Sequence, residues 1–244
     1  MEKGVLSNMV RLIYVILASL PFVLFYLAKS HYVIEHIDNY SEQEVYSMVQ
    51  RMIQIMKHNG KIETDVFGKE NLPKEGGYVM YPNHQGKYDA LGIINAHDTP
   101  CTFLIDEKRS GLPFAHQFAD MLKASRLDKT DIRSALVTIN EIAKQVKEGR
   151  RYIVFPEGGY VDNSNKMEQF KPGAFKCSVR SKTPIVPVAL IDSYRVFGIN
   201  SLKKVKTQVH FLPPIYYEEY ESMSTVEIAE MVKNRIEQTI ASND

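Results

Sequence analysis

His84 and Asp89 stand directly after an apolar run that ends at Pro82. Proline cannot donate to a strand ladder and favours extended geometry in the residue before it, so the run is expected to end there and to release His84 into a loop. Gly86 lets that loop turn back, and Asp89 is expected to cap the helix that follows. A carboxylate bonded to Nδ1 of His84 would leave Nε2 free to take a proton, as a general base for an attacking hydroxyl requires.

A single histidine in a loop is more often structural than catalytic, so a second signal is needed. It comes from residues 151–160, where another apolar run ends at Pro156 and is followed by Glu157, Gly158 and Gly159. Parallel strands deliver their carboxyl ends to one edge of an α/β sheet, where ligands bind. The two strand exits are therefore expected to meet and to form one site.

The elements that must position this site alternate along the chain. Strands are predicted over residues 62–67, 78–81, 102–105, 152–155, 185–191 and 205–211. Apolar side chains at helical spacing predict a helix over 131–148 that stops at Gly149, and Ser224 opens the last helix with a capping box. Strand followed by helix, repeated, predicts an α/β fold with a mainly parallel sheet and helices on both faces.

The N-terminal part of the chain differs from this pattern. Residues 12–28 carry no charge and lie between Arg11 and Lys29. As a helix they would be about 25 Å long, slightly less than the roughly 30 Å of a hydrocarbon core, and residues 5–10 would lengthen them. Because Pro21 can kink such a helix, a spanning helix and a bent one within one leaflet both stay open. A cleaved signal peptide and a buried helix of a soluble protein are the weaker alternatives.

A second helix is predicted from Ser41, which begins a capping box, to about Gly60. Its apolar side chains recur at helical spacing, so one face is apolar and the other polar. Two interpretations stay open for that apolar face. It packs on the folded domain, or it lies on a bilayer beside the first helix.

Composition excludes several classes of function. The 244 residues are 44% hydrophobic, enough for one sizeable core, and the net charge of +1 indicates no broad attraction for nucleic acid. Cys101 and Cys177 lack metal-binding spacing, which indicates buried thiols in a reducing compartment and no metal site. Gly-x-Ser-x-Gly, His-Glu-x-x-His, P-loop and Gly-x-Gly-x-x-Gly motifs do not occur, which disfavours serine hydrolases, metalloproteases and nucleotide-binding enzymes.

Three short blocks together resemble a known family. They are Asn83-His84 with Asp89, then Phe155-Pro156-Glu157-Gly158, then Pro184-Ile-Val-Pro-Val188. In order and spacing they resemble signature blocks of the glycerolipid acyltransferases, in particular the bacterial 1-acyl-sn-glycerol-3-phosphate acyltransferases. The resemblance covers roughly residues 65–215.

This resemblance implies transfer of an acyl chain to the free hydroxyl of lysophosphatidic acid, giving phosphatidic acid. His84 would be the general base and Asp89 would orient it, while acyl carrier protein or coenzyme A carries the acyl group as a thioester. No metal or other cofactor is expected. The partners would be membrane lipid, lysolipid and the acyl carrier, with no nucleic acid. The oligomeric state and the acyl-chain length stay open.

The resemblance also implies a location and a division of the chain. Residues 1–60 are expected to be membrane-associating helices and residues 61–244 the acyltransferase domain, at the cytoplasmic side of the cell membrane. It also implies roles in substrate binding for the turn and block residues, which are Asn83, Gly86, Phe155, Pro156, Glu157 and Gly158. Backbone amides near Gly86 or Gly158 are expected to hold the oxyanion.

Two departures from the family pattern concern the acceptor. Lys129 and Tyr160 stand where arginines are expected, and a lysine lacks the planar fork with which arginine binds phosphate. Arg133 is a candidate for the missing charge. An acyltransferase acting on another lysolipid or on a non-phosphate acceptor therefore stays open as the second reading. An inactive membrane-tethered lipid-binding protein, and a hydrolase in which water replaces the hydroxyl, are further alternatives.

Overall fold

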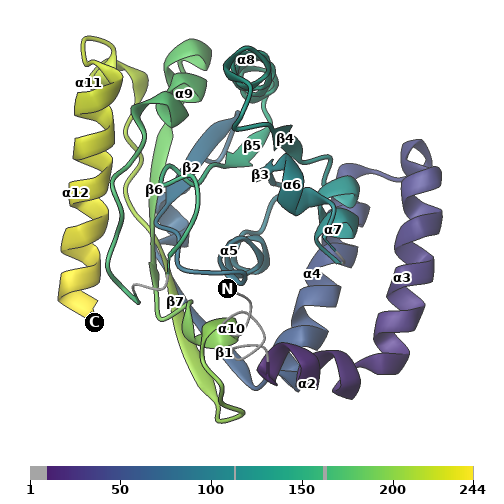
Figure 1. Ribbon diagram of the computed structural model, residues 1–244. Helices are drawn as coiled ribbons and strands as arrows, with labels where there is room; N and C mark the ends of the chain where they lie inside the picture. Colours follow the sequence, from purple (N-terminus) through teal and green to yellow (C-terminus); the bar gives the residue numbers. More distant parts are fainter. Residues whose placement is uncertain (1–9, 113, 162–163, 244) are drawn as a thin grey trace.

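A computed structural model of the protein describes residues 10–112, 114–161 and 164–243. Its centre is a seven-stranded sheet in the order β1-β7-β6-β2-β5-β3-β4 (Figure 1). The strands are β1 (Ile62–Phe67), β2 (Tyr78–Pro82), β3 (Thr102–Asp106), β4 (Ser125–Leu127), β5 (Arg151–Ile153), β6 (Ile185–Ile191) and β7 (Val205–Phe211). All paired strands run parallel except β6 and β7. The carboxyl ends of β2, β3, β5 and β6 therefore lie at one edge of the sheet.

Helices connect most of these strands. They are α2 (Val10–Ala18), α3 (Leu20–Glu35), α4 (Glu42–Asn59), α5 (Asp89–Ala96), α6 (Glu107–Ser110), α7 (Ala115–Met121), α8 (Ile132–Lys147), α9 (Lys176–Ser181), α10 (Arg195–Gly198), α11 (Tyr217–Tyr220) and α12 (Thr225–Asn243). Short 3₁₀ turns lie at η1 (Ile37–Asn39), η2 (Lys69–Asn71) and η3 (Pro172–Phe175). Helices α8, α9 and α12 lie on one side of the sheet, and α4 and α5 on the other (Figure 1).

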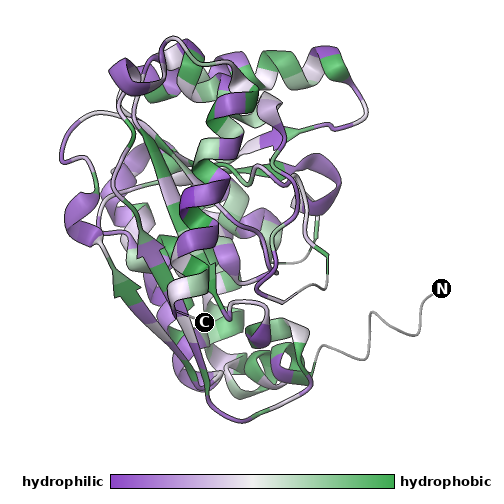
Figure 2. Cartoon of the chain, turned by 90° about the vertical axis from the view of Figure 1, so that its left-hand side faces the viewer, coloured by the Kyte–Doolittle hydropathy of each residue, from purple (hydrophilic) through white to green (hydrophobic). Residues whose placement is uncertain are grey.

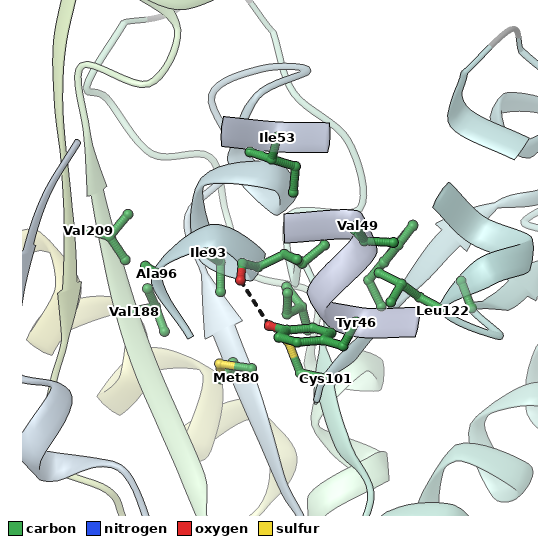
Figure 3. Packing of buried hydrophobic residues seen from close by; sticks show 14 of the residues in the cluster. Tyr46, Val49, Ile53, Met80, Ile93, Ala96, Cys101, Leu122, Val188 and Val209 are labelled. Atoms are coloured by element: carbon green, nitrogen blue, oxygen red, sulfur yellow. Dashed lines mark hydrogen bonds between the residues drawn. The ribbon is translucent and has the colours of Figure 1, made fainter. Parts of the chain in front are cut away.

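Strand β6 shows how the sheet separates two cores. All of its residues are buried, and successive side chains point to opposite faces. Val186, Val188 and Leu190 belong to the core that includes residues of α4 and α5, where Figure 3 shows Val188, while Ile185 and Ile191 pack with α8 and α12. In Figure 2 the apolar strands lie behind the more hydrophilic outer surface of α12. The expected α/β fold with helices on both faces is confirmed.

The predicted elements agree closely with the observed ones. The six predicted strands are all present, with bounds that differ by at most two residues, and the helix expected over 131–148 is α8. Strand β4 was not predicted, because its three residues include Arg126 and are too short for an alternating pattern to show.

The N-terminal apolar segment forms two helices. They are α2 and α3, which break at Ser19 just before Pro21 and meet at an angle of 81°. Among the described residues no single helix has the length and apolar character to cross a bilayer, although this bent pair meets both criteria together. The predicted kink is therefore confirmed, and residues 5–9 of the suggested extension lie outside the described part.

A buried arginine fixes α2 to the domain. The side chain of Arg11 is only 1% exposed, and its guanidinium donates to the carbonyl oxygens of Gly60 and Lys203, each at 2.6 Å. Burial lowers the pKa of this group. Arg11, the residue that precedes the apolar segment in the sequence, thus holds α2 against the domain.

Helix α4 belongs to the packed body of the molecule. The Ser41 capping box is present, and Val45, Tyr46, Val49 and Ile53 are buried in the core that faces β2 and β6. Packing on the domain, the first of the two interpretations stated for this helix, is therefore what the structure shows. The division of the chain at residue 60 stays a prediction.

Candidate active site

His84 and Asp89 meet as the spacing predicts. Strand β2 ends at Pro82, a loop carries His84, and α5 begins at Asp89. Nδ1 of His84 lies 2.7 Å from Oδ2 of Asp89. The imidazole is 15% exposed and the carboxylate is fully buried, so only the histidine of this pair is open to solvent. The contact assigns the proton to Nδ1 and leaves Nε2 as an acceptor.

The carboxylate of Asp89 does not cap α5 in the expected way. Its Oδ2 accepts the amides of Gln85 at 2.5 Å and Gly86 at 2.8 Å, which precede the helix, while its Oδ1 accepts the hydroxyl of Ser193. The helix has no side-chain cap bond. Asp89 therefore closes the loop around His84 onto itself, and the prediction of a capping role was wrong.

The same loop is fastened to the end of β6. The Asn83 amide donates to the carbonyl of Leu190 at 3.0 Å and accepts its N–H at 2.7 Å. Gln85 donates to the Leu190 carbonyl at 3.0 Å and accepts the amide of Ser193 at 2.9 Å. Because Asn83 is only 1% exposed, its contacts are those of a structural residue, and its contact with substrate stays a prediction.

Glu157 supports the histidine from the second strand exit. Its Oε1 accepts the backbone amide of His84 at 2.8 Å, and its Oε2 accepts the amide of Glu168 at 3.2 Å. Burial raises the pKa of Glu157 to about 7, although these two hydrogen bonds oppose the rise. The two strand exits therefore meet as predicted. In this structure Glu157 holds the His84 backbone, and its expected contact with the acceptor stays a prediction.

Aromatic rings frame the imidazole on two sides. Phe155 stacks on His84 with ring centroids 4.0 Å apart, and Tyr160 forms a T-shaped pair with His84 at a centroid distance of 4.7 Å. The guanidinium of Arg109 lies over the ring of Tyr160, 4.9 Å from its centroid. Burial raises the pKa of Tyr160, and the charge of Arg109 opposes that rise. Pro156, between these elements, is buried and accepts the amide of Lys171 through its carbonyl.

Of the two cations predicted to bind the acceptor, Lys129 contacts the turn that carries Glu157, and Arg133 has no described contact with that turn. Lys129 donates to the carbonyl of Gly158 at 2.6 Å and pairs with Asp106 at 2.7 Å. This pair lowers the pKa of Asp106, so the carboxylate stays charged beside the lysine. The Arg133 side chain is exposed near the start of α8, and no contact joins it to His84 within the described ranges.

The amides of Gly86 and Gly158, near which an oxyanion site is expected, both have partners. The Gly86 N–H donates to Asp89, and the Gly158 N–H donates to the Phe155 carbonyl at 3.1 Å. Gly158 adopts a left-handed conformation with φ of 73°, which favours glycine at this tight turn. Other amides near these glycines therefore stay the predicted donors to an oxyanion.

One cavity among the described residues is far from this site in the fold. It has a volume of about 270 Å³ and lies beside Cys101 and Arg150, which precede β3 and β5. It therefore sits at the amino ends of the strands, opposite the edge that carries His84. Both cysteines are buried free thiols.

Sequence reasoning missed three residues of the site. Gln85 and Ser193 hold the loop and the carboxylate, and Arg109 contacts Tyr160. A signal existed for Ser193, because it follows a predicted parallel strand, as His84 and Glu157 do. No local pattern indicated Arg109, since its contact joins helix α6 to Tyr160, which is distant in sequence.

Comparison with known proteins defines the class. A profile of the acyltransferase family matches residues 63–191, more than half of the chain and the whole of the site's first and second strand exits. The chain therefore belongs to the acyltransferase family.

Particular relatives share this family. The chain is 30% identical over 195 residues to a 1-acyl-sn-glycerol-3-phosphate acyltransferase of Saccharomyces cerevisiae, covering 76% of this chain and 62% of that protein. It is 28% identical over 170 residues to a protein of the same name from Escherichia coli, covering 69% of each. The chain thus spans somewhat less than two thirds of the yeast relative.

One solved structure shows the same fold. It is the crystal structure of the 1-acyl-sn-glycerophosphate (LPA) acyltransferase from Thermotoga maritima, with a TM-score of 0.75 and 20% sequence identity. The alignment covers 97% of this chain and 96% of that one, so the likeness extends over the N-terminal helices as well as the sheet.

Proposed function

We propose that the protein transfers an acyl chain from a thioester to the hydroxyl of a lysolipid, with His84 as general base. The observation that carries the proposal is the 2.7 Å contact between Nδ1 of His84 and a buried Asp89, which leaves Nε2 as the proton acceptor of a ring that is 15% exposed. Nε2 takes the hydroxyl proton as the oxygen attacks the thioester carbonyl, and Asp89 stabilises the imidazolium. The thiolate then leaves and takes the proton from the imidazolium.

For the acceptor we propose lysophosphatidic acid, which makes phosphatidic acid the product. The names of the relatives support this choice. A phosphate also needs a cation, and Arg109 lies one aromatic ring away from His84. Arg109 has no ion pair with a carboxylate among the described residues, so its charge is available. The acyl donor is proposed to be acyl carrier protein or acyl coenzyme A.

A specific observation favours a second acceptor class. Lys129, which donates to the Gly158 carbonyl, is neutralised by Asp106, and Tyr160 stands where the family resemblance expects arginine. A lysolipid without a phosphate monoester would need no further positive charge there. An acceptor that carries an uncharged or zwitterionic head group is therefore the second candidate.

A panel of acceptors tests both candidates. The purified full chain is given labelled acyl coenzyme A or acyl carrier protein with lysophosphatidate, lysophosphatidylcholine or monoacylglycerol, and the products are separated. Transfer to lysophosphatidate alone supports the first candidate, and transfer only to the other two acceptors rejects it. His84→Ala should abolish transfer while the protein stays folded, whereas a lipid-binding protein without activity would show no transfer in either form.

We also propose that α2 and α3 attach the enzyme to the cytoplasmic face of the cell membrane. Apolar side chains are exposed along both helices, and among them Leu17 is 64%, Leu24 60% and Phe25 57% exposed. Such surfaces gain by burial at the boundary between head groups and acyl chains. Leu17→Glu with Phe25→Glu should reduce sedimentation with phospholipid vesicles, whereas Val226→Glu on α12 should not. Equal sedimentation of all variants would refute the proposal.

A further inference from the structure

Ser193 lies behind the pair formed by His84 and Asp89. It belongs to the loop that follows β6, is only 3% exposed, and donates its hydroxyl to Oδ1 of Asp89 across 104 residues of sequence. We propose that Ser193 is a positioning residue that holds the Asp89 carboxylate in the orientation His84 needs. The inference rests on the proposed function, because it concerns the same general base.

The contacts of the carboxylate show why a further donor matters. Oδ2 of Asp89 is shared by His84 and the amides of Gln85 and Gly86. A partial turn of the carboxylate about its Cβ–Cγ bond would move this oxygen out of line with its three donors. The hydroxyl of Ser193 engages Oδ1 and so opposes the turn.

Ser193 is itself held in place by its backbone. Its amide donates to Oε1 of Gln85 at 2.9 Å, and the other end of the Gln85 side chain donates to the Leu190 carbonyl at 3.0 Å. The backbone and the side chain of Ser193 thus both contact the loop that carries His84, one at Gln85 and the other at Asp89. The hydroxyl is therefore aimed at the carboxylate before any substrate binds, which is how preorganised sites avoid reorganisation during reaction.

The geometry excludes a nucleophilic role for this serine. Its hydroxyl donates to Asp89, and His84 contacts the other oxygen of that carboxylate. A nucleophilic serine would instead donate to the imidazole and face the solvent side. Ser193 acts through Asp89 and touches no reacting atom.

A double-mutant cycle tests the assignment with the full-length protein. The variants are Ser193→Ala, Asp89→Asn and their combination, and the assay uses acyl coenzyme A with whichever acceptor the wild type accepts. Loss of a hydrogen bond to a charged group corresponds to a fall of about 10-fold or more, so we expect Ser193→Ala to lower kcat about 10-fold with KM unchanged. In the Asp89→Asn background the second substitution should cost less than 2-fold, because the amide that Ser193 would still hold carries no charge to stabilise the imidazolium.

Two further variants separate positioning from folding. Ser181→Ala removes another buried serine hydroxyl, which donates within α9 to the Cys177 carbonyl, and should leave kcat unchanged. Ser193→Thr keeps a hydroxyl and should retain more activity than Ser193→Ala. If Ser193→Ala does not fold, Ser193→Cys, whose thiol is a much weaker hydrogen-bond donor, replaces it in the cycle.

The results that overturn the inference are distinct from those that overturn the proposed function. Full activity of Ser193→Ala, a rise in KM without a change in kcat, or losses that multiply in the double variant would each reject the positioning role. A wild-type protein that transfers no acyl chain to any acceptor, or a His84→Ala variant that is fully active, would reject the general-base proposal instead.

Discussion

Asp89→Asn should separate the charge of the carboxylate from its shape. The asparagine oxygen is expected to take the place of Oδ2, because its amide nitrogen there would face two backbone N–H groups and His84 Nδ1–H. The amide nitrogen then lies at Oδ1, where the Ser193 hydroxyl can rotate to accept it. The loop and the histidine tautomer are thus retained, and only the negative charge is lost.

The magnitude follows from the distance between the two groups. With His84 Nδ1 2.7 Å from Oδ2, the charge centres of imidazolium and carboxylate are about 4 Å apart. Two unit charges at that separation interact by about 4 kcal/mol at an effective dielectric constant of about 20. Since about 1.4 kcal/mol corresponds to a tenfold change in rate, kcat should fall about 10³-fold.

The assay measures kcat and KM for acyl transfer beside the free energy of unfolding in urea. His84→Ala serves as the reference for complete loss of the base, and the unfolding measurement confirms that Asp89→Asn remains folded. A folded Asp89→Asn protein that keeps more than a tenth of the wild-type kcat would refute the reasoning, because the charge would then contribute almost nothing to the reaction.

Three other predictions concern the surroundings of the site. The native Glu157 carboxyl keeps its proton up to about pH 7, against an ordinary pKa of 4.5, so the folded state binds more protons between these values and its stability falls as pH rises through this window. Glu157→Gln should remove this contribution to the pH dependence of stability. Relative to the wild type, the unfolding free energy of the variant should therefore rise by about 3 kcal/mol across the window, and equal pH dependence of the two proteins in urea unfolding would contradict this. Arg109→Ala should raise KM for lysophosphatidate about 10-fold, as loss of one charge-assisted contact implies, whereas Lys108→Ala on the same helix should not, and equal effects would indicate bulk charge alone. Gly77→Ala should destabilise the protein by at least about 2 kcal/mol in thermal or urea unfolding, because a Cβ there would lie 2.0 Å from the Val146 carbonyl oxygen, while Gly111→Ala meets nothing within 4 Å and should be nearly neutral.

Local patterns predicted the strands and the main contact of the site well. Pro82 and Pro156 mark the points where apolar runs end, and both runs are strands whose exits meet at one edge. The five-residue spacing from His84 to Asp89 also placed the ring against the carboxylate. These predictions succeeded because each depends on neighbours in the sequence or on the general geometry of parallel sheets.

What could not be predicted depends on contacts between distant segments. The carboxylate of Asp89 accepts amides of its own loop, which no capping pattern indicates, and Ser193 reaches it from beyond β6. In the same way, Lys129 is charged in the sequence but paired with Asp106 in the structure. The net positive charge near the Gly158 turn therefore could not be predicted from the sequence.

The fastening of the His84 loop to the end of β6 has a consequence during synthesis. The ribosome releases His84 and Asp89 more than 100 residues before Leu190 and Ser193, whose contacts complete the loop. A nascent or truncated chain that ends before β6 therefore holds both reactive side chains without the bonds that order them. The chain would become able to react with a thioester only late in translation, after β6 and the loop that follows it have docked.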